Sequence, residues 1–248
     1  MMQLILAGGK TPTLFGIDFA FSIPWEETDD LFKLTGLDDV RSLWKLVDDR
    51  CRDVPHLYAG PIWTAADSPF RPYIFHHASG HRGPRYSRER KRQVDLMAGD
   101  AISIYHMVGP QVGAGSFAGM RMLHAIAKTA GSGVAIWPFQ PIDQAAHAVV
   151  EIYPSLFYRQ AGVHRPRKAD LLTSKFAALE TALAFHGAAG VCDPNNCRSV
   201  DQADALISAA ALRGIASNDN PFPLGGLQSD PREGWILGVP SGQAAAAD

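Results

Sequence analysis

Hydrophobic residues recur along this chain in runs and stripes that predict alternating strands and helices. Residues 14–24 (LFGIDFAFSIP) are almost entirely apolar apart from Asp18, which is typical of a strand buried on both faces. A carboxylate within such a strand is costly unless a partner satisfies it. Asp18 therefore either caps neighbouring backbone or belongs to a site.

Two helices are predicted in the next part of the chain. Residues 26–35 begin acidic and end before Gly36, as a short helix does. Residues 37–51 carry apolar side chains at helical spacing, with Asp38 and Asp39 in the first turn. From Arg52 to about Gln93 the periodicity disappears, which indicates a long loop or insertion.

The middle of the chain has the pattern of a βαβ unit. Residues 101–107 and 133–139 are predicted strands, and residues 116–129 form a predicted helix between them. The segment before that helix is rich in glycine. Gly113, Gly115 and Ser116 fit either a tight turn or an anion site at a helix start.

The last third predicts another strand and two more helices. Residues 147–154 form a strand with Glu151 near its end, and residues 168–186 have the spacing of an amphipathic helix. A helix opens at Ser199 with Asp201 and Asp204 on one face, where acids also complement the helix dipole. Residues 234–239 are a predicted edge strand.

Composition predicts a globular protein rather than a membrane or secreted one. The 248 residues are 46% hydrophobic with a net charge of −2, which fits one large domain over 1–240 with an insertion at about 52–95, followed by a disordered tail over 241–248. No apolar run is long enough for a membrane span, and no signal peptide is recognisable. A cytoplasmic location is expected. Three cysteines do not make a disulfide framework, and the Cys192–Cys197 pair fits two separate thiols better than a zinc site.

One stretch departs from this balance. Between Arg71 and Arg92 there are seven arginine or lysine residues and a single acid, Glu89. The stretch is either a solvated surface loop or an arm that contacts the phosphates of DNA or RNA. The candidate nucleic-acid contacts are Arg82, Arg85, Arg88, Arg90, Lys91 and Arg92.

The carboxylates suggest a second kind of chemistry. Asp18 and Glu151 lie on predicted strands, and Asp201 and Asp204 lie at the start of a helix. Mg²⁺ and Mn²⁺ prefer such oxygen ligands, and paired ions assist phosphodiester cleavage. The histidines are scattered and do not suggest a competing acyl-transfer site.

At the level of motifs, the chain resembles a domain-of-unknown-function family of predicted nucleases with a ribonuclease-H-like fold. The matching pieces occur in the family's order at residues 16–24, 113–120, 135–139, 150–154, 201–212 and 233–240. The late DxxDA helix is also similar to the final acidic helix of Holliday-junction resolvases. The resemblance implies a mixed sheet flanked by helices, with Asp18, Glu151 and Asp204 as ligands of one or two Mg²⁺ or Mn²⁺ ions and Asp201 assisting in catalysis.

The resemblance has one departure. Family members usually begin with a strand that bears an aspartate, whereas no acidic residue precedes Asp18 here. The expected fold is therefore a ribonuclease-H-like α/β fold that lacks the usual first strand. The first functional hypothesis is a metal-dependent nuclease, and the alternative is a catalytically inactive binding or assembly protein. A relative of the actin-like ATPases is a third hypothesis, opposed by the absence of two glycine-rich phosphate loops.

Overall fold

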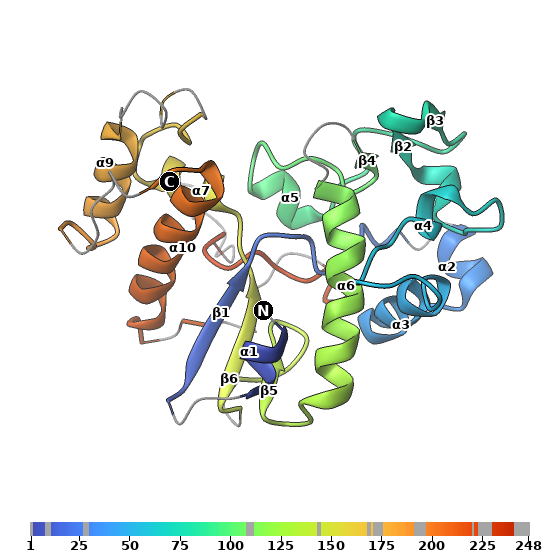
Figure 1. Ribbon diagram of the computed structural model, residues 1–248, viewed down its shortest axis with the longest axis horizontal. Coiled ribbons are helices and arrows are strands. Elements are labelled where there is room, and N and C mark those ends of the chain that lie inside the picture. Colours follow the sequence, from blue (N-terminus) through green and yellow to red (C-terminus); the bar gives the residue numbers. More distant parts are fainter. Residues whose placement is uncertain are drawn as a thin grey trace, which may run out of the picture.

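The protein is a mixed α/β structure with two small sheets flanked by helices, seen here in a computed structural model (Figure 1). The described residues are 2–7, 11–26, 30–107, 112–142, 145–167, 170, 176–190, 197–219, 221–222 and 230–240. The first sheet is parallel, with strand order β1–β6–β5, and the second is mixed, with order β3–β2–β4.

The strands are short. Those of the parallel sheet are β1 (Thr13–Ile17), β5 (Val134–Ile136) and β6 (His147–Glu151). Those of the mixed sheet are β2 (Phe75–His76), β3 (His81–Arg82) and β4 (His106–Met107).

The helices fall on either side of the parallel sheet in Figure 1, with α6 and α3 on one side and α7, α9 and α10 on the other. The first half of the chain forms α1 (Met2–Ala7), α2 (Asp30–Thr35), α3 (Val40–Arg50), α4 (Pro61–Thr64), η1 (Arg71–Tyr73), η2 (His77–Ser79) and α5 (Gln93–Met97). The second half forms α6 (Val112–Thr129), α7 (Pro154–Gln160), α9 (Ala177–Phe185) and α10 (Val200–Ala216).

Alternation along the parallel strands divides the core into two clusters. Phe15 and Ile17 of β1 pack into the cluster that includes α3 and α6, whereas Leu14 packs into the cluster of α7, α9 and α10. Val149 and Val150 of β6 divide in the same way. Successive side chains of a strand point to opposite faces, so each short strand supports both helical layers.

Several predicted helices are confirmed, and their ends have local causes. In α3 the Asp39 carboxylate accepts from the Ser42 N–H at 2.6 Å, and Ser42 Oγ accepts from the Asp39 N–H at 3.3 Å. This reciprocal capping box satisfies donors that a helix start leaves unpaired. Ser199 caps α10 in a similar way, accepting from the Gln202 N–H at 3.1 Å.

Three sequence predictions about strands and loops differ from the structure. First, residues 101–107 and 133–139 do not form one βαβ unit, because β4 pairs with β2 whereas β5 pairs with β6 in the other sheet. Second, β1 ends at Ile17, lies at an edge of its sheet and is only partly buried, so Asp18 follows the strand. Third, the predicted loop over 52–95 contains α4, η1, β2, η2, β3 and α5.

Two further predictions are met in part. The predicted helix over 168–186 is present as α9, and residues 168–169 and 171–175 lie outside the described part of the chain. The predicted edge strand over 234–239 forms one parallel bridge, between Ile236 and Glu151. The predicted tail over 241–248 also lies outside the described residues. In the described parts of the chain, no helix has the length and apolar character needed to cross a membrane.

Candidate functional site

Glu151 stands at the carboxyl end of the central strand β6 and is 2% exposed. Its Oε1 accepts from Arg92 Nη2 at 2.5 Å, and its Oε2 accepts from Arg92 Nη1 at 2.8 Å. Oε2 also accepts from the Phe21 N–H at 2.9 Å. Burial raises the pKa of Glu151, and the Arg92 guanidinium works against that rise. Both oxygens are therefore already engaged by protein donors.

Arg92 was predicted to contact nucleic acid, but it lies in the interior of the protein. The residue is 1% exposed and pairs with Asp95 as well as Glu151, with Nη2 donating to Asp95 Oδ1 at 2.7 Å. Burial opposes its charge, but Asp95 and Glu151 hold the pKa of Arg92 well above its ordinary value. Its guanidinium faces carboxylates, so it does not face a nucleic-acid backbone.

A third buried acid, Glu233, extends this network. Glu233 Oε1 accepts from the Trp25 N–H at 2.7 Å, and Oε2 accepts from the Gln93 N–H at 2.8 Å. Burial raises the pKa of Glu233, partly offset by these backbone donors. Its carbonyl oxygen accepts from Arg92 Nη1 at 3.3 Å. The three acids and one arginine tie β6, α5 and the segment after β1 together.

Residues 18–25, which follow β1, are irregular and held by side chains from elsewhere in the chain. The Ala20 N–H donates to Ser116 Oγ at 3.0 Å, and the Phe21 carbonyl accepts from Trp44 Nε1 at 2.7 Å. Buried backbone groups outside regular structure need such partners. The sequence pieces at 16–24, 113–120, 150–154 and 233–240 thus meet at one segment, a relationship that their spacing along the chain does not reveal.

The glycine-rich segment before the predicted helix is itself helical at Gly113 and Gly115, and Gly113 and Gly119 allow close packing. Gly113 and Gly115 lie inside α6. A β-carbon on Gly113 would approach the Ile104 carbonyl oxygen at 2.1 Å, and one on Gly119 would meet the Phe19 ring at 2.3 Å. The tight turn therefore does not describe Gly113 and Gly115, whereas the anion site at the helix start stays a prediction.

The remaining predicted acids gather beside the carboxyl end of β1, and we call Asp18, Asp201 and Asp204 the acidic cluster. Asp18 is exposed as a residue, although many protein atoms surround its carboxyl group. Burial first, and then the charge of Asp204, raise the pKa of Asp18 to about 6, with smaller contributions from Glu151 and Asp201. Arg165 opposes this rise. Asp201 itself is exposed, in the first turn of α10.

Asp204 is 6% exposed and is paired with Arg165. Arg165 Nε donates to both carboxylate oxygens of Asp204 at 3.0 Å, and Nη2 also donates to Oδ2. The Arg165 side chain is 43% exposed. Arg165 is therefore accessible to solvent while it neutralises the buried Asp204 carboxylate.

The predicted Mg²⁺ or Mn²⁺ site does not fit this arrangement. Glu151 is saturated by Arg92 and Phe21, and both oxygens of Asp204 are taken by Arg165. Within the described residues, no group of three or more His, Cys, Asp or Glu side chains is placed to hold an ion. Hard cations require several free oxygen ligands, which the described conformation does not supply.

The other basic residues of segment 71–92 surround aromatic rings on the small mixed sheet. We call Phe75, Arg82, Tyr86, Arg88 and His106 the basic-aromatic face. Arg82 and Arg88 are exposed, and the three rings are partly buried. The Arg82 guanidinium lies 5.0 Å from the centre of the Tyr86 ring and 6.0 Å from that of Phe75. Arg88 Nη2 lies 3.4 Å from His106 Nε2.

The other predicted nucleic-acid contacts of this segment are engaged by protein groups or partly buried. Arg85 is exposed and donates to the Tyr73 hydroxyl at 3.1 Å. Arg90 lies over the Tyr73 ring at 4.8 Å and is 3.5 Å from the Glu26 carboxylate. Lys91 is partly buried. Sequence charge alone could not separate Arg82 and Arg88 from Arg90 and Arg92, because only the fold decides which guanidinium is exposed.

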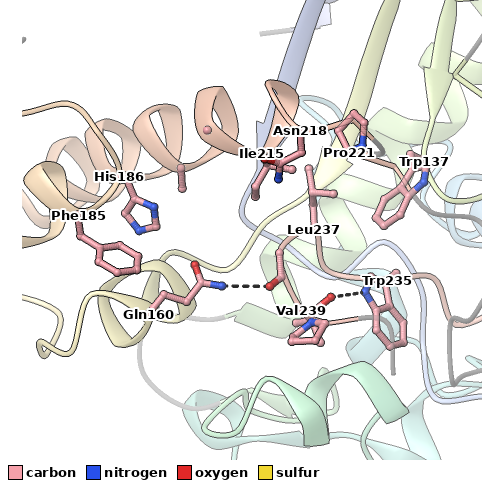
Figure 2. Close-up of a pocket in the computed structure, with 14 residues that line it drawn as sticks. Trp137, Gln160, Phe185, His186, Ile215, Asn218, Pro221, Trp235, Leu237 and Val239 are labelled. Carbon is pink, nitrogen blue, oxygen red and sulfur yellow. Dashed lines mark hydrogen bonds between the residues drawn. The ribbon is translucent and has the colours of Figure 1, made fainter. Parts of the chain in front are cut away.

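A separate cavity of about 480 Å³ lies between α7, α9, α10 and residues 235–240 (Figure 2). Phe185 and His186 line one end, and Trp137 and Trp235 line the other. Gln160 Nε2 donates to the Gly238 carbonyl at 3.1 Å, and Trp235 Nε1 donates to the Val239 carbonyl at 3.0 Å. The cavity shares no lining residue with the acidic cluster and is mainly apolar.

The described cysteines form no disulfide with one another. Cys51 and Cys197 are both buried and neither forms a disulfide with a described residue, and Cys192 lies outside the described part of the chain. Burial raises the pKa of Cys51, which disfavours the reactive thiolate.

Comparison with known protein families, with curated proteins and with solved structures finds no significant match to this chain. The acidic cluster and the basic-aromatic face are thus defined by the chain's own residues.

Proposed function

We propose that this protein binds nucleic acid through the basic-aromatic face, on a ribonuclease-H-like scaffold. The observation that carries the proposal is the gathering of exposed Arg82 and Arg88 on a platform of three rings. Guanidinium groups neutralise phosphates and release counterions, and aromatic rings stack with bases. The parallel sheet with helices on both sides is compatible with the scaffold that the sequence motifs resemble.

The ion pairs formed by two of the predicted metal ligands favour a binding role over hydrolysis in this conformation. Arg165 neutralises Asp204, and Arg92 neutralises Glu151. Two of the three acids that the resemblance assigns to metal binding are therefore committed to ion pairs. The proposal accordingly follows the alternative hypothesis, a ribonuclease-H-like binding protein.

A metal-dependent nuclease is the second candidate, favoured by one specific observation. Asp18 has a pKa raised to about 6 beside Asp204 and Asp201, at the carboxyl edge of a parallel sheet. Ligands commonly bind at that edge in α/β proteins. A cation would offset the repulsion between these carboxylates. Because Arg165 occupies both oxygens of Asp204, a metal-dependent nuclease requires Arg165 to leave Asp204.

Fluorescence anisotropy with labelled DNA strands, RNA strands, duplexes and hybrids tests the proposal. We expect binding that weakens with salt, and a weaker salt dependence for the double variant Arg82→Gln/Arg88→Gln. Each lost phosphate contact should reduce the slope of log affinity against log salt by about 0.7 to 0.9. The matched control is Arg41→Gln/Lys128→Gln, which removes two exposed charges from α3 and the end of α6.

The two pairs of substitutions should behave differently. Equal losses of affinity in both double variants would show that net charge, not this face, carries binding. The same oligonucleotides incubated with Mn²⁺ distinguish the second candidate. Cleavage that Asp18→Asn abolishes and Asp53→Asn does not would establish hydrolysis at the acidic cluster and replace the binding role as the primary activity.

A further inference from the structure

The three rings of the basic-aromatic face pack against one another in a compact cluster, and the Arg82 guanidinium lies over two of them. The Phe75 and His106 rings stack with centroids 5.5 Å apart and planes at 26°. Tyr86 stacks on His106 at 5.8 Å and 20°, and contacts Phe75 at 5.4 Å. The three rings therefore form one compact unit contributed by β2, β4 and the segment after β3.

The rings are fixed in place before any ligand arrives. Phe75 and His106 are directly paired across the parallel strands β2 and β4. The Tyr86 hydroxyl is hydrogen-bonded to His106 Nδ1. An oriented platform loses little conformational freedom on binding, which favours affinity.

Arg82 lies over two rings of this cluster. It is exposed, and its guanidinium lies over Tyr86 at 5.0 Å and Phe75 at 6.0 Å. Arg82 therefore combines contact with the rings and access to solvent, so its planar group is within reach of a ligand. Arginine planes stack on bases as aromatic rings do.

We infer that the ligand of this face is single-stranded nucleic acid, with an unpaired base stacked on Arg82 above Tyr86. The inference rests on the proposed function and specifies its substrate class. Exposed Arg88, which lies beside His106, supplies positive charge for the adjoining phosphate. Bases within a duplex have their faces covered by neighbouring bases, so a stacking platform selects strands whose bases are free.

Three probes of equal phosphate number separate stacking from charge. They are a labelled oligothymidine, an abasic strand of the same length, and a duplex that contains the same number of phosphates. We expect the oligothymidine to bind at least about fivefold more tightly than the abasic strand, as expected for one stacked base.

Arg82→Lys is the decisive variant because it keeps the charge and removes the planar group. We expect it to weaken oligothymidine binding at least about fivefold while changing abasic-strand binding less than about twofold. Arg82 is exposed, so the variant is expected to fold. Arg41→Lys, at an exposed arginine of α3 away from this face, is the matched control and should leave both affinities unchanged.

The outcomes distinguish this inference from the proposed function. Equal affinity for the oligothymidine and the abasic strand, or tighter binding of the duplex, would overturn the single-strand inference and leave nucleic-acid binding intact. Absence of binding to all three probes would overturn both. An Arg82→Lys variant that binds oligothymidine as the parent does would also contradict stacking.

Discussion

The Arg92 guanidinium holds both carboxylate oxygens of Glu151, at 2.5 and 2.8 Å, in the interior of the protein. Arg92 is 1% exposed and Glu151 is 2% exposed. The pair joins the end of β6 to the start of α5, and the Phe21 N–H binds the same carboxylate. Residues that resemble a metal ligand and a phosphate contact in sequence are thus each other's partners.

Glu151→Gln is expected to destabilise the protein strongly, because it leaves the buried Arg92 charge with Asp95 as its remaining acidic partner. Removing one member of a buried ion pair typically costs about 3 to 5 kcal/mol. Urea unfolding followed by circular dichroism measures the change. Glu180→Gln, on the exposed face of α9, is the control and should stay within about 0.5 kcal/mol of the parent. Equal urea midpoints for the two variants would contradict a structural role for Glu151.

Asp18→Asn should stabilise the protein at high pH and not at low pH. The pKa of Asp18 is raised from 3.8 to about 6 in the folded state. Above pH 6 the carboxylate is ionised in both states and is disfavoured in the fold, whereas below pH 3.8 it is neutral in both. The gain from asparagine is therefore largest above pH 6 and fades as the pH falls toward 4.

This gain should be modest, below about 1 kcal/mol, because water screens the exposed part of the carboxylate. Thermal unfolding at a series of pH values measures it, and Asp53→Asn controls for the loss of one negative charge. A gain that is constant with pH, or that grows toward low pH, would show that Asp18 is not crowded by the other acids.

Arg165→Gln should convert the acidic cluster into a cation site. The variant removes the guanidinium that neutralises Asp204 and leaves Asp18 and Asp201 nearby. We expect Mn²⁺ to raise the melting temperature of this variant more than that of the parent. Arg167→Gln, an exposed arginine two residues away, is the matched control. Equal effects of Mn²⁺ on both variants would remove the acidic cluster from consideration as a latent metal site.

Alanine substitutions at two glycines of α6 test the packing of this helix, and their expected effects on stability have opposite signs. Gly115→Ala should stabilise the protein by up to about 1 kcal/mol, because alanine favours helix and nothing lies within 4 Å of the added carbon. Gly113→Ala should destabilise it, because the new carbon would meet the Ile104 carbonyl at 2.1 Å. Thermal unfolding of both variants decides the point. A stabilising Gly113→Ala would mean that α6 can shift from β4 without cost.

Local patterns predicted the helices well because their causes are local. The stripe of Val40, Leu43, Trp44 and Val47 predicted α3, and all four side chains are buried in the core. Ser199 predicted the start of α10 and caps it. The irregular 18–25 segment could not be predicted, because its backbone is satisfied by Ser116, Trp44, Glu151 and Glu233 from distant parts of the chain.

The candidate site was predicted in part. Asp18, Asp201 and Asp204 do come together beside the parallel sheet, as the sequence predicted for its acids. Glu151 does not join them as a free ligand. The roles of Asp95 and Glu233 were missed, and the one available signal was that both stand close to apolar residues that proved to be core.

The sequence alone determined where α3, α6 and α10 form, which residues carry charge, and that one stretch concentrates arginine, since these properties depend on neighbours a few positions apart. Tertiary structure decided which sheet each strand joins and which of those charges reach solvent. Arg82 and Arg92 have the same chemistry ten positions apart, yet the first is exposed over a cluster of rings and the second is buried between carboxylates. Burial and long-range pairing made that difference, because a charge in the interior is tolerated only where an opposite charge meets it.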